Sequence, residues 1–341
     1  MQRIAAHFFY LFLGVACTLP LLADETAIDW PTFQGNNART GASDYPAITI
    51  PEIAWSTRVG IMGYLNCPVI DGDRVFVTSS GDKHNERDNR DGVYCLDLKT
   101  GEILWHFKTP MDACGITIDK TRVYVGDDNG GFHAIDCETG ERLWRYEFNA
   151  SVYGPPLRVD DLILAGGADG MVVAFDPKTG KKQWSFHHDD SMRSGLSSDG
   201  KHIFAVYLHA RVVCFDLKGN VLWQRDALDA PEGDIERREI YSTPTIHKGD
   251  VYFGFARDTT YETPAISKLR ATGVFEWCAP NAGALANKQA LTFGNIRSSF
   301  AVYKDELIYA EPYGNKVVWA RPFDGQVTKL YRCGIEMFPH W

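Results

Sequence analysis

The sequence lacks several features that would assign it to a familiar class of protein. It has no Cys-x-x-Cys pair, and beyond its first 22 residues it has no apolar run long enough to span a membrane. It also lacks an excess of basic residues, because the formal net charge is −9. An acidic chain of this kind is not expected to bind nucleic acid or an anionic membrane surface. No nucleophile motif, phosphate-binding loop or convincing pair of catalytic carboxylates is present.

The first 23 residues have the pattern of an export signal. Arg3 supplies a positive start, residues 8–16 form an apolar stretch, and Leu21–Ala23 is a suitable cleavage site. The alternative is an uncleaved anchor, since residues 4–22 are nearly long enough to span a bilayer. Lipidation of Cys17 would give weak membrane association, but the preceding residues lack the usual leucine. We therefore expect a periplasmic or otherwise exported protein of the bacterial cell envelope, with no integral span after cleavage.

The cysteines show no metal-binding spacing. Cys95 and Cys214 occupy a repeat position that alanine fills elsewhere, which indicates small buried side chains. Cys67 and Cys114 lie at nearly matching points of adjacent repeats and are the better disulfide candidates. Spacing alone does not set the geometry of a disulfide, so this pairing stays open. Seven cysteines remain after signal cleavage, and they are Cys67, Cys95, Cys114, Cys137, Cys214, Cys278 and Cys333.

An eleven-residue phrase recurs along the chain and determines the expected fold. It spans residues 134–144 and 174–184, and an earlier copy at 95–105 differs from the shared pattern only at its first position. A repeat of about 40 residues is typical of propellers and solenoids. Each unit also contains four short β-branched or aromatic runs separated by Gly/Asp turns, which is the pattern of a four-stranded propeller blade.

We therefore predict an all-β fold, a β-propeller of four-stranded blades with six full repeats plus a partial seventh or later blade. Residues 53–57 read as a fourth strand that precedes any first strand, and the chain stops where another first strand would begin. Both truncation and irregular closure of the ring are consistent with this pattern. The expected organisation is a signal peptide at 1–23, an N-terminal leader at 24–52 and the propeller domain at 53–341.

The most regular residues of the phrase are interpreted as structural. Aspartate accepts hydrogen bonds from turn amides, glycine adopts positive φ, and tryptophan packs between neighbouring blades. These residues are Asp97, Gly101, Trp105, Asp136, Gly140, Trp144, Asp176, Gly180, Trp184, Asp216, Trp223 and Trp277.

The long connections provide the functional signal. Because strands alternate direction within a blade, all five are expected on one face, and they span residues 81–92, 187–193, 227–240, 258–264 and 279–297. Loops held by a rigid scaffold are common binding sites. First strands enter the channel from the same face, so the candidate channel-mouth residues are Tyr64, Asn66, Asp112, Tyr153, Arg193, Tyr241 and Arg297.

Two readings of this channel mouth remain open. The arginines and tyrosines can clamp an anion or a peptide carboxylate. Alternatively, the arginines pair with acidic loop residues such as Asp189, Asp190 or Glu232. Residues 187–190 (His-His-Asp-Asp) do not form a convincing metal site, because neighbouring residues on an extended strand point to opposite faces. No catalytic residue and no metal site is predicted.

The phrase Ala-x-Asp-x-x-Thr-Gly-x-x-x-Trp resembles the tryptophan-docking repeat of pyrroloquinoline-quinone (PQQ) type propellers, over roughly residues 53–332. The leader at 29–41 is similar to the segment that precedes such propellers in many exported bacterial proteins. The resemblance implies either of two activities. Enzymes of the family bind PQQ, and alcohol-oxidising members often carry two adjacent cysteines and a calcium held by Glu and Asn. Non-catalytic members resemble the propeller lipoprotein of outer-membrane-protein assembly, which binds a partner protein and no cofactor.

The chain has no adjacent cysteines and no Glu/Asn/Asp set that matches the enzymes. We therefore expect an exported non-catalytic scaffold that presents its loop-rich face to a protein or peptide partner, with no cofactor. The alternative is a PQQ-dependent alcohol or sugar oxidoreductase, or a degenerate relative of one, with PQQ and Ca²⁺. A sugar- or anion-binding sensor that uses the channel mouth is a third hypothesis.

Overall fold

The structure is a computed structural model. It describes residues 30–43, 52–63, 65–209, 211–226, 238–254, 256–257, 265–270, 275–280, 298–311, 316–322 and 327–332. Outside these ranges lie the proposed signal peptide, Cys17, Tyr64, Glu232, Arg297, Cys333 and most or all of the predicted insertions at 227–240, 258–264 and 279–297. None of the helical segments within them combines the length and hydrophobicity needed to cross a membrane.

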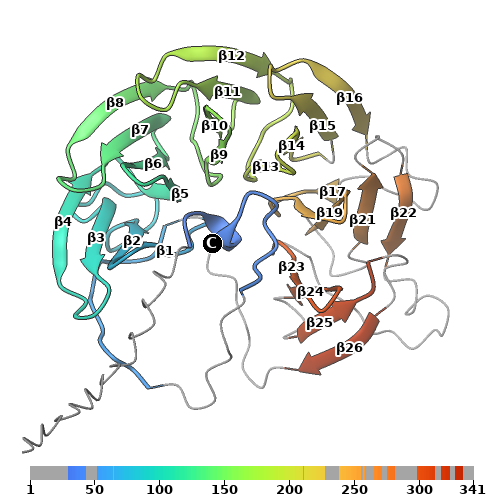
Figure 1. Ribbon diagram of the computed structural model, residues 1–341, viewed down its shortest axis with the longest axis horizontal. Coiled ribbons are helices and arrows are strands. Elements are labelled where there is room, and N and C mark those ends of the chain that lie inside the picture. Colours follow the sequence, from blue (N-terminus) through green and yellow to red (C-terminus); the bar gives the residue numbers. More distant parts are fainter. Residues whose placement is uncertain are drawn as a thin grey trace, which may run out of the picture.

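Six antiparallel sheets of four strands each follow one another around a common centre (Figure 1), which confirms the predicted propeller of six four-stranded repeats. Blade 1 contains β1 (Val69–Asp71), β2 (Arg74–Ser79), β3 (Gly92–Asp97) and β4 (Ile103–Lys108). Blade 2 contains β5 (Ala113–Ile118), β6 (Arg122–Asp127), β7 (Gly131–Asp136) and β8 (Arg142–Glu147). Blade 3 contains β9 (Leu157–Val159), β10 (Leu162–Gly166), β11 (Met171–Phe175) and β12 (Lys182–His187).

The remaining blades follow the same order. Blade 4 contains β13 (Ser197–Ser198), β14 (His202–Val206), β15 (Arg211–Asp216) and β16 (Val221–Asp226). Blade 5 contains β18 (Thr245–His247), β19 (Asp250–Gly254), β21 (Ala265–Arg270) and β22 (Phe275–Pro280). Blade 6 contains β23 (Ala301–Tyr303), β24 (Glu306–Glu311), β25 (Lys316–Ala320) and β26 (Val327–Arg332). A separate two-stranded sheet pairs β17 (Arg238–Glu239) with β20 (Ala256–Arg257).

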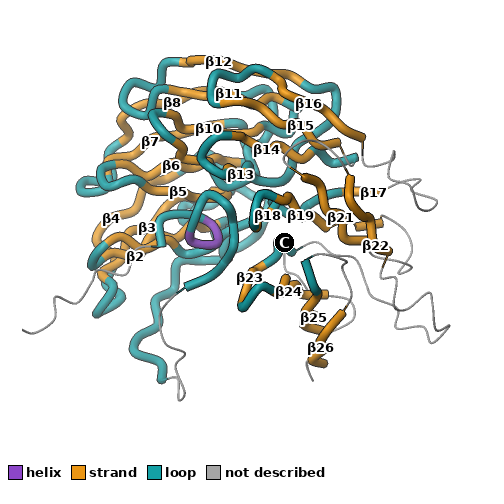
Figure 2. Tube along the Cα trace, turned by 45° about the vertical axis from the view of Figure 1, so that its right-hand side comes forward, coloured by secondary structure: helices purple, strands orange, loops and turns teal. Residues whose placement is uncertain are grey.

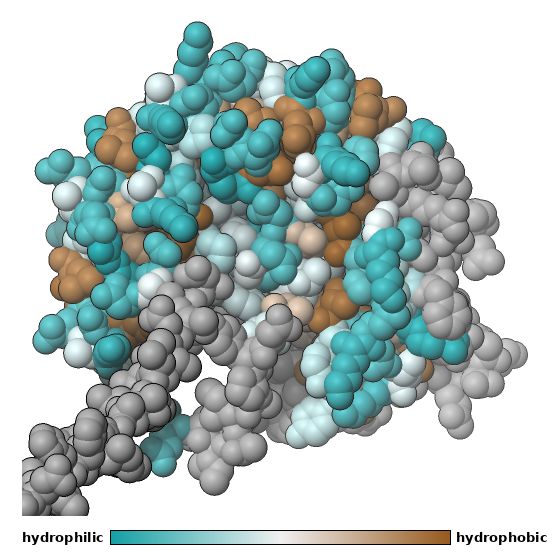
Figure 3. Space-filling view, in the orientation of Figure 1, coloured by the Kyte–Doolittle hydropathy of each residue, from teal (hydrophilic) through white to brown (hydrophobic). Residues whose placement is uncertain are grey.

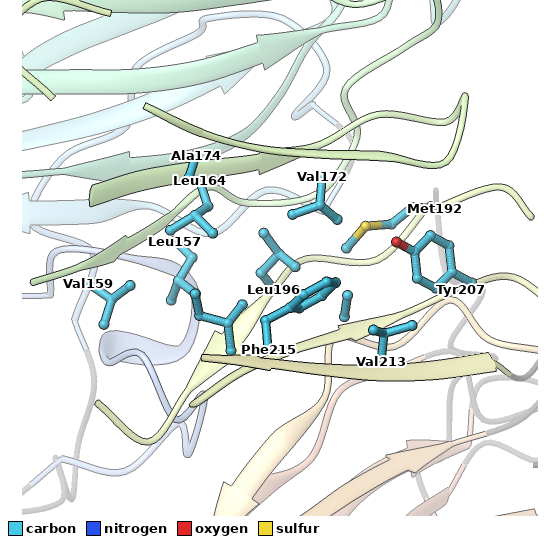
Figure 4. Close-up of a cluster of buried hydrophobic side chains, with 12 residues drawn as sticks. Leu157, Val159, Leu164, Val172, Ala174, Met192, Leu196, Tyr207, Val213 and Phe215 are labelled. Atoms are coloured by element: carbon cyan, nitrogen blue, oxygen red, sulfur yellow. The ribbon is translucent and has the colours of Figure 1, made fainter. Parts of the chain in front are cut away.

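Burial explains why the second and third strands of blades 1 to 4 are mainly apolar and the fourth strands are mixed. In these blades the second and third strands are buried over most of their length, whereas β4, β8 and β12 alternate between exposed and partly buried residues. The hydrophobic core lies between neighbouring blades. Between blades 3 and 4, for example, Leu164 and Val172 pack with Leu196, Val213 and Phe215 (Figure 4). Blade packing thus buries apolar surface that a single sheet would expose.

The outer surface is mostly hydrophilic on the face shown in Figure 3, where hydrophobic residues gather in separate patches. The fourth strands contribute exposed apolar side chains such as Leu104, Leu143 and Leu222. Single exposed apolar residues are normal on a protein surface, so these side chains alone do not indicate an interface.

The turn of the repeat is held by its aspartate. Asp97 Oδ1 accepts hydrogen bonds from the backbone N–H of Lys99 at 2.9 Å and of Thr100 at 2.7 Å. Asp136, Asp176 and Asp216 accept the equivalent bonds in the next three blades. Gly101 closes the turn with φ of +72°, a conformation that is costly for a residue with a side chain.

The tryptophan of each phrase docks onto the turn of the following blade. Trp105 Nε1 donates to Cys137 O at 3.1 Å, and its ring covers Gly140. Trp144 docks in the same way on Pro177 O and Gly180, and Trp184 docks on Leu217 O and Gly219. The position opposite each tryptophan across the sheet is small, being Cys95, Ala134, Ala174 or Cys214. This pairing explains why small buried cysteines take the place of alanine.

Residues 52–60 provide an unexpected extra docking contact. They were predicted to contain a fourth strand at 53–57, but in the structure this segment forms no strand. Trp55 nevertheless donates to Leu98 O at 2.9 Å, and its ring covers Gly101 as the other docking tryptophans cover their glycines. Trp55 therefore occupies the place of a tryptophan from a blade preceding blade 1. Within the described ranges, no sheet combines strands from the two ends of the chain.

The leader lies at the centre of the ring, where its short helix η1 (Phe33–Gly35) is visible in Figures 1 and 2. It hydrogen-bonds to the first strand of every blade. The bonds join Trp30 to Ile70, Pro31 to Ile118, Asn37 to Arg158 and Ser198, Ala38 to Ile246, and Thr40 to Val302, at distances of 2.6–2.9 Å. The first strands are thus linked to one another through a segment that precedes all of them in sequence.

The predicted disulfide candidate is wrong in this structure. Cys67 and Cys114 are both free, as are Cys95, Cys137 and Cys214. Cys114 is buried while Cys67 is partly exposed, and burial raises the pKa of the Cys95 and Cys214 thiols to about 12. The buried thiols behave as small apolar groups.

Candidate binding site at the channel mouth

A cavity of about 310 Å³ opens where several blades meet at the channel mouth. Three of the predicted channel-mouth residues, Asp112, Tyr153 and Arg193, line it together. Each precedes the first strand of its blade, which is why the propeller brings them together from blades 2, 3 and 4. The remaining lining residues are His84, Asn85, Cys114 and Asp128.

Asp112 is the most buried charged group of this cavity, at 5% exposure. Its Oδ2 accepts a hydrogen bond from the backbone N–H of Asn85 at 3.1 Å and lies 3.3 Å from His84 Nδ1. Its Oδ1 is buried and has no hydrogen-bond partner among the described residues. A buried carboxylate oxygen without a donor is costly, so this geometry favours a ligand that supplies one.

The loop that covers the cavity is held by its own acidic residues. Asp88 Oδ1 accepts from the N–H of Arg90 at 2.8 Å, and Asp88 N–H donates to Asp91 Oδ2 at 2.8 Å. Arg90 also forms an ion pair with Asp82. These bonds place His84 and Asn85 against Asp112 instead of leaving the whole loop in solvent.

Arg193 and Tyr153 form the opposite part of the lining. The guanidinium carbon of Arg193 lies 6.0 Å from the centroid of the Tyr153 ring, a cation–π geometry. Burial raises the pKa of the Tyr153 hydroxyl, and the negative charge of Asp128 adds to the effect. Arg193 Nε has no hydrogen-bond partner within the described ranges.

The alternative reading, in which Arg193 pairs with an acidic residue of the 187–193 loop, is not seen for the described residues. Asp190 is used elsewhere, since its carboxylate accepts from His209 Nδ1 at 2.6 Å and from the His209 N–H at 2.8 Å. No ion pair joins Arg193 to Asp189. The described acidic side chains of this loop therefore leave the guanidinium available.

The remaining predicted mouth residues do not line the cavity. Asn66 Nδ2 donates to Thr78 O at 3.0 Å, and Tyr241 donates its hydroxyl proton to Glu239. The Asn66 side chain is thereby bonded to the second strand of blade 1, and the Tyr241 side chain to the separate sheet of β17 and β20. Tyr64 and Arg297 lie outside the described residues.

Sequence reasoning missed His84, Asn85 and Asp128. The charged loop containing His84 looked solvated, yet the His84 side chain is only 29% exposed because it leans on Asp112. Asp128 follows β6, in a short turn that gave no signal. One sequence feature alone pointed to these residues. It is the expectation that connections between second and third strands lie on the channel-mouth face.

The Cys114 thiol of this lining is not activated as a nucleophile. Burial raises the pKa of the Cys114 thiol well above its usual value, and the charges of Asp128, Asp127 and Asp112 act in the same direction. Such a thiol is a poor nucleophile. Nowhere in the described ranges do three His, Cys, Asp or Glu side chains come together in a way that could hold a metal ion.

The His188 region is occupied by structural contacts. His188 is buried, its Nδ1 accepts from the N–H of Asp190 at 3.0 Å, and its ring lies 4.5 Å from that of Tyr207. Burial lowers the pKa of His188. A neutral imidazole packed in this way supports the loop between blades 3 and 4.

A family model described as Outer membrane protein assembly factor BamB matches residues 31–107 and 89–321 of the chain. The chain belongs to this family. The matched residues include most of the described leader, blades 1 to 5 and the first three strands of blade 6, so the family assignment covers well over half of the chain. The predicted resemblance to PQQ-type propellers, closer to the non-catalytic members, is thereby confirmed.

Two characterised relatives represent the two activities implied by the resemblance. The Outer membrane protein assembly factor BamB of Burkholderia pseudomallei is 26% identical over 68% of this chain and 61% of its own length. The Methanol dehydrogenase [cytochrome c] subunit 1 of Paracoccus denitrificans is 28% identical over 71% of this chain and 38% of its own length. The chain thus spans less than two thirds of the length of either relative.

Solved structures with low sequence identity support the fold alone. BamB from Moraxella catarrhalis matches with a TM-score of 0.59 and 17% identity, covering 80% of this chain and 76% of that one. The computationally designed Ika8 protein matches with a TM-score of 0.55 and 12% identity, covering 81% and 90%.

The residues of the cavity do not fit the cofactor implied by the enzymes of the family. PQQ is a rigid tricarboxylate, and a site for it needs several cationic or hydrogen-bond-donating groups. The described lining offers one guanidinium, Arg193, beside two carboxylates, Asp112 and Asp128, and its His84 Nδ1 and Asn85 N–H already face Asp112. Repulsion between these carboxylates and those of the quinone opposes binding.

Proposed function

We propose that this protein is an exported, non-catalytic propeller of the bacterial cell envelope that binds another protein through its loop-rich face, in outer-membrane-protein assembly. Membership of the BamB family supports this proposal. The relative from Burkholderia pseudomallei, which is named as an assembly factor, supports it as well. We propose no cofactor.

The observation that carries the proposal is the gathering of non-blade structure on one face. The 81–91 loop reaches the channel-mouth cavity. In the extra sheet, β17 at the end of the 227–240 insertion pairs with β20, which lies directly before the 258–264 insertion. Ile240 N–H also donates to Leu208 O at 2.7 Å, which ties this extra sheet to the turn after β14. A rigid scaffold that holds several loops together is suited to recognition.

The opposite face offers less for a partner. Its turns are the short Asp-x-x-Thr-Gly connections, whose polar groups are already paired within the turn. The leader lies at the centre of the ring. It contacts the first strands at residues that follow, in sequence, the residues that line the channel-mouth cavity, so it lies deeper in the channel than this cavity. We therefore assign recognition to the loop-rich face.

Site-specific photo-crosslinking in the native host tests this assignment. A photoreactive phenylalanine analogue at Arg87 or Asp189, both exposed on the loop-rich face, is expected to crosslink one and the same protein. The matched control positions are Lys99 and Lys178, which are exposed on the opposite turns. Crosslinking of that protein from the control positions instead would show that the faces are wrongly assigned.

A second candidate function, PQQ-dependent oxidation of an alcohol or sugar, is favoured by the methanol dehydrogenase relative. Purified protein can be mixed with PQQ and Ca²⁺ while tryptophan fluorescence and dye-linked alcohol oxidation are followed. We expect neither saturable quenching nor turnover. Both together would replace the scaffold function by the enzymatic one.

A further inference from the structure

We propose that the channel-mouth cavity binds a small zwitterion, a molecule that carries an ammonium group and a carboxylate and has the size of a free amino acid or a dipeptide. This site goes beyond the protein-binding function and does not depend on it. The cavity volume of about 310 Å³ lies at the lower end of the range found for small-molecule pockets.

The first half of the argument is the carboxylate side. Asp112 is nearly fully buried, and only its Oδ2 is satisfied, by Asn85 N–H and His84. Its Oδ1 has no donor among the described residues, and Asp128 places a second carboxylate on the same lining. An ammonium carries three donors and a positive charge, so it matches this side of the cavity.

The second half is the guanidinium side. The guanidinium carbon of Arg193 lies 6.0 Å from the centroid of the Tyr153 ring, a cation–π contact that does not use the hydrogen-bond donors of the guanidinium. No carboxylate within the described ranges lies within ion-pair distance of it, although Asp112 and Asp128 line the same cavity. A guanidinium with free donors binds a carboxylate with two parallel hydrogen bonds.

The combination selects for both charges in one molecule. A simple anion would meet Arg193 but also two carboxylates, and a simple amine would meet the carboxylates but also the guanidinium. A zwitterion can satisfy Asp112 and Arg193 together and so bridges two charged groups that do not pair with each other. Discrimination of this kind arises because each incomplete ligand leaves a buried charge unpaired.

Isothermal titration calorimetry tests the proposal. The probes are the twenty standard amino acids and L-alanyl-L-alanine, each at up to about 10 mM, the range in which weak specific binding is measurable. We expect at least one probe to bind, and comparing the affinities of the amino acids with that of the dipeptide shows which length of zwitterion fits the cavity. Propionate, which lacks the ammonium, and ethylamine, which lacks the carboxylate, are each expected to bind at least about tenfold more weakly.

Two variants and two matched controls complete the test. Arg193→Met and Asp112→Asn are each expected to weaken binding of the best probe about tenfold or more. Asp112→Asn retains an oxygen acceptor for Asn85 N–H, so the loop can keep its position. The exposed changes Arg142→Met and Asp161→Asn, which lie away from the cavity, are expected to leave affinity unchanged.

Three outcomes would overturn the proposal. They are the absence of binding by every probe, binding of ethylamine or propionate as tight as that of the best amino acid, and unchanged affinity in both cavity variants. Circular dichroism of each variant separates loss of binding from loss of fold. The photo-crosslinks test protein binding at exposed loop positions, whereas calorimetry tests zwitterion binding in the cavity. Failure of one proposal can therefore be distinguished from failure of the other.

Discussion

At the scale of single residues, the docking tryptophans connect the repeat sequence with blade packing. Trp144 shows the full set of contacts. Its indole N–H donates to Pro177 O at 2.9 Å, its ring covers Gly180, and it packs against the rings of Phe132 and Phe175 at centroid distances of 5.6 and 5.8 Å. One side chain therefore joins blades 2 and 3 through a hydrogen bond and apolar contacts.

Replacing Trp144 by alanine is expected to lower the free energy of unfolding by about 3 kcal/mol or more, since truncation removes buried aromatic surface and leaves Pro177 O without its donor. Urea denaturation followed by circular dichroism measures the change. The control is Leu143→Ala on the same strand, where the side chain is 47% exposed and the loss should be well below that of Trp144. Equal losses at the two positions would argue against the docking role.

At the scale of elements, the aspartate turn recurs in blades 1 to 4, and one irregularity of strand pairing recurs in every blade. The pairing of third and fourth strands shifts by one residue at the same place in all six blades, directly after the small residue opposite the tryptophan in blades 1 to 4. A bulge of this kind increases local twist and re-aims a side chain. Blade 6 reverses the arrangement of tryptophan and small residue. Its third strand carries Trp319 where blades 1 to 4 have a small residue, and Lys329 of the fourth strand lies over the Trp319 ring at 4.7 Å.

The turn aspartates make these elements sensitive to acid. Hydrogen bonds from the turn backbone, first of all from the N–H of Thr100, Thr139 and Thr179, lower the pKa of Asp97, Asp136 and Asp176 below the ordinary value of 3.8. A carboxyl whose pKa is lowered on folding stabilises the protein above its unfolded value, and this stability is lost as pH falls through the folded value.

The melting temperature is therefore expected to drop as pH falls from about 5 to about 2.5. A variant with all three aspartates changed to asparagine should show a smaller drop, because asparagine still accepts the turn bonds but does not titrate. Differential scanning calorimetry across this pH range measures both curves. Parallel curves for the two proteins would assign acid sensitivity to other carboxylates.

At the scale of the whole molecule, the leader connects the blades at the centre of the ring. It bonds the first strand of each of the six blades, and Arg39 within it is fully buried while donating to Leu196 O, Phe33 O and Pro156 O at 3.0–3.1 Å. Sequentially neighbouring blades contact only each other in most repeat arrays. Here a single segment joins non-neighbouring blades, which makes their folding interdependent.

Deleting residues 30–43 from the full chain is expected to lower the melting temperature by more than about 10 °C, since it removes at least six cross-blade backbone bonds and the buried Arg39 contacts. A synthetic peptide of residues 29–43 added to the truncated protein should restore part of the loss. A scrambled peptide of the same composition is the control. A truncated protein that melts within a few degrees of the full chain would contradict the central role of the leader.

Much of the fold was predictable because the repeat is local. Each strand, the Asp-x-x-Thr-Gly turn and the docking tryptophan depend on residues within about 40 positions, so periodicity and turn chemistry were sufficient. Three of the seven residues that line the candidate site were predictable as well. Asp112, Tyr153 and Arg193 followed from the rule that first strands enter the channel from the loop-rich face, whereas His84, Asn85 and Asp128 did not.

The sequence by itself determined the strand order and the number of complete blades, because spacing along one chain sets both. Only the tertiary structure decided which residues meet across blades. It placed His84 on Asp112, left Arg193 free of Asp190, seated Trp55 on Gly101 and ran the leader along every first strand. Such contacts join residues up to hundreds of positions apart, and they depend on the distances and burial that arise once blades pack around a common centre.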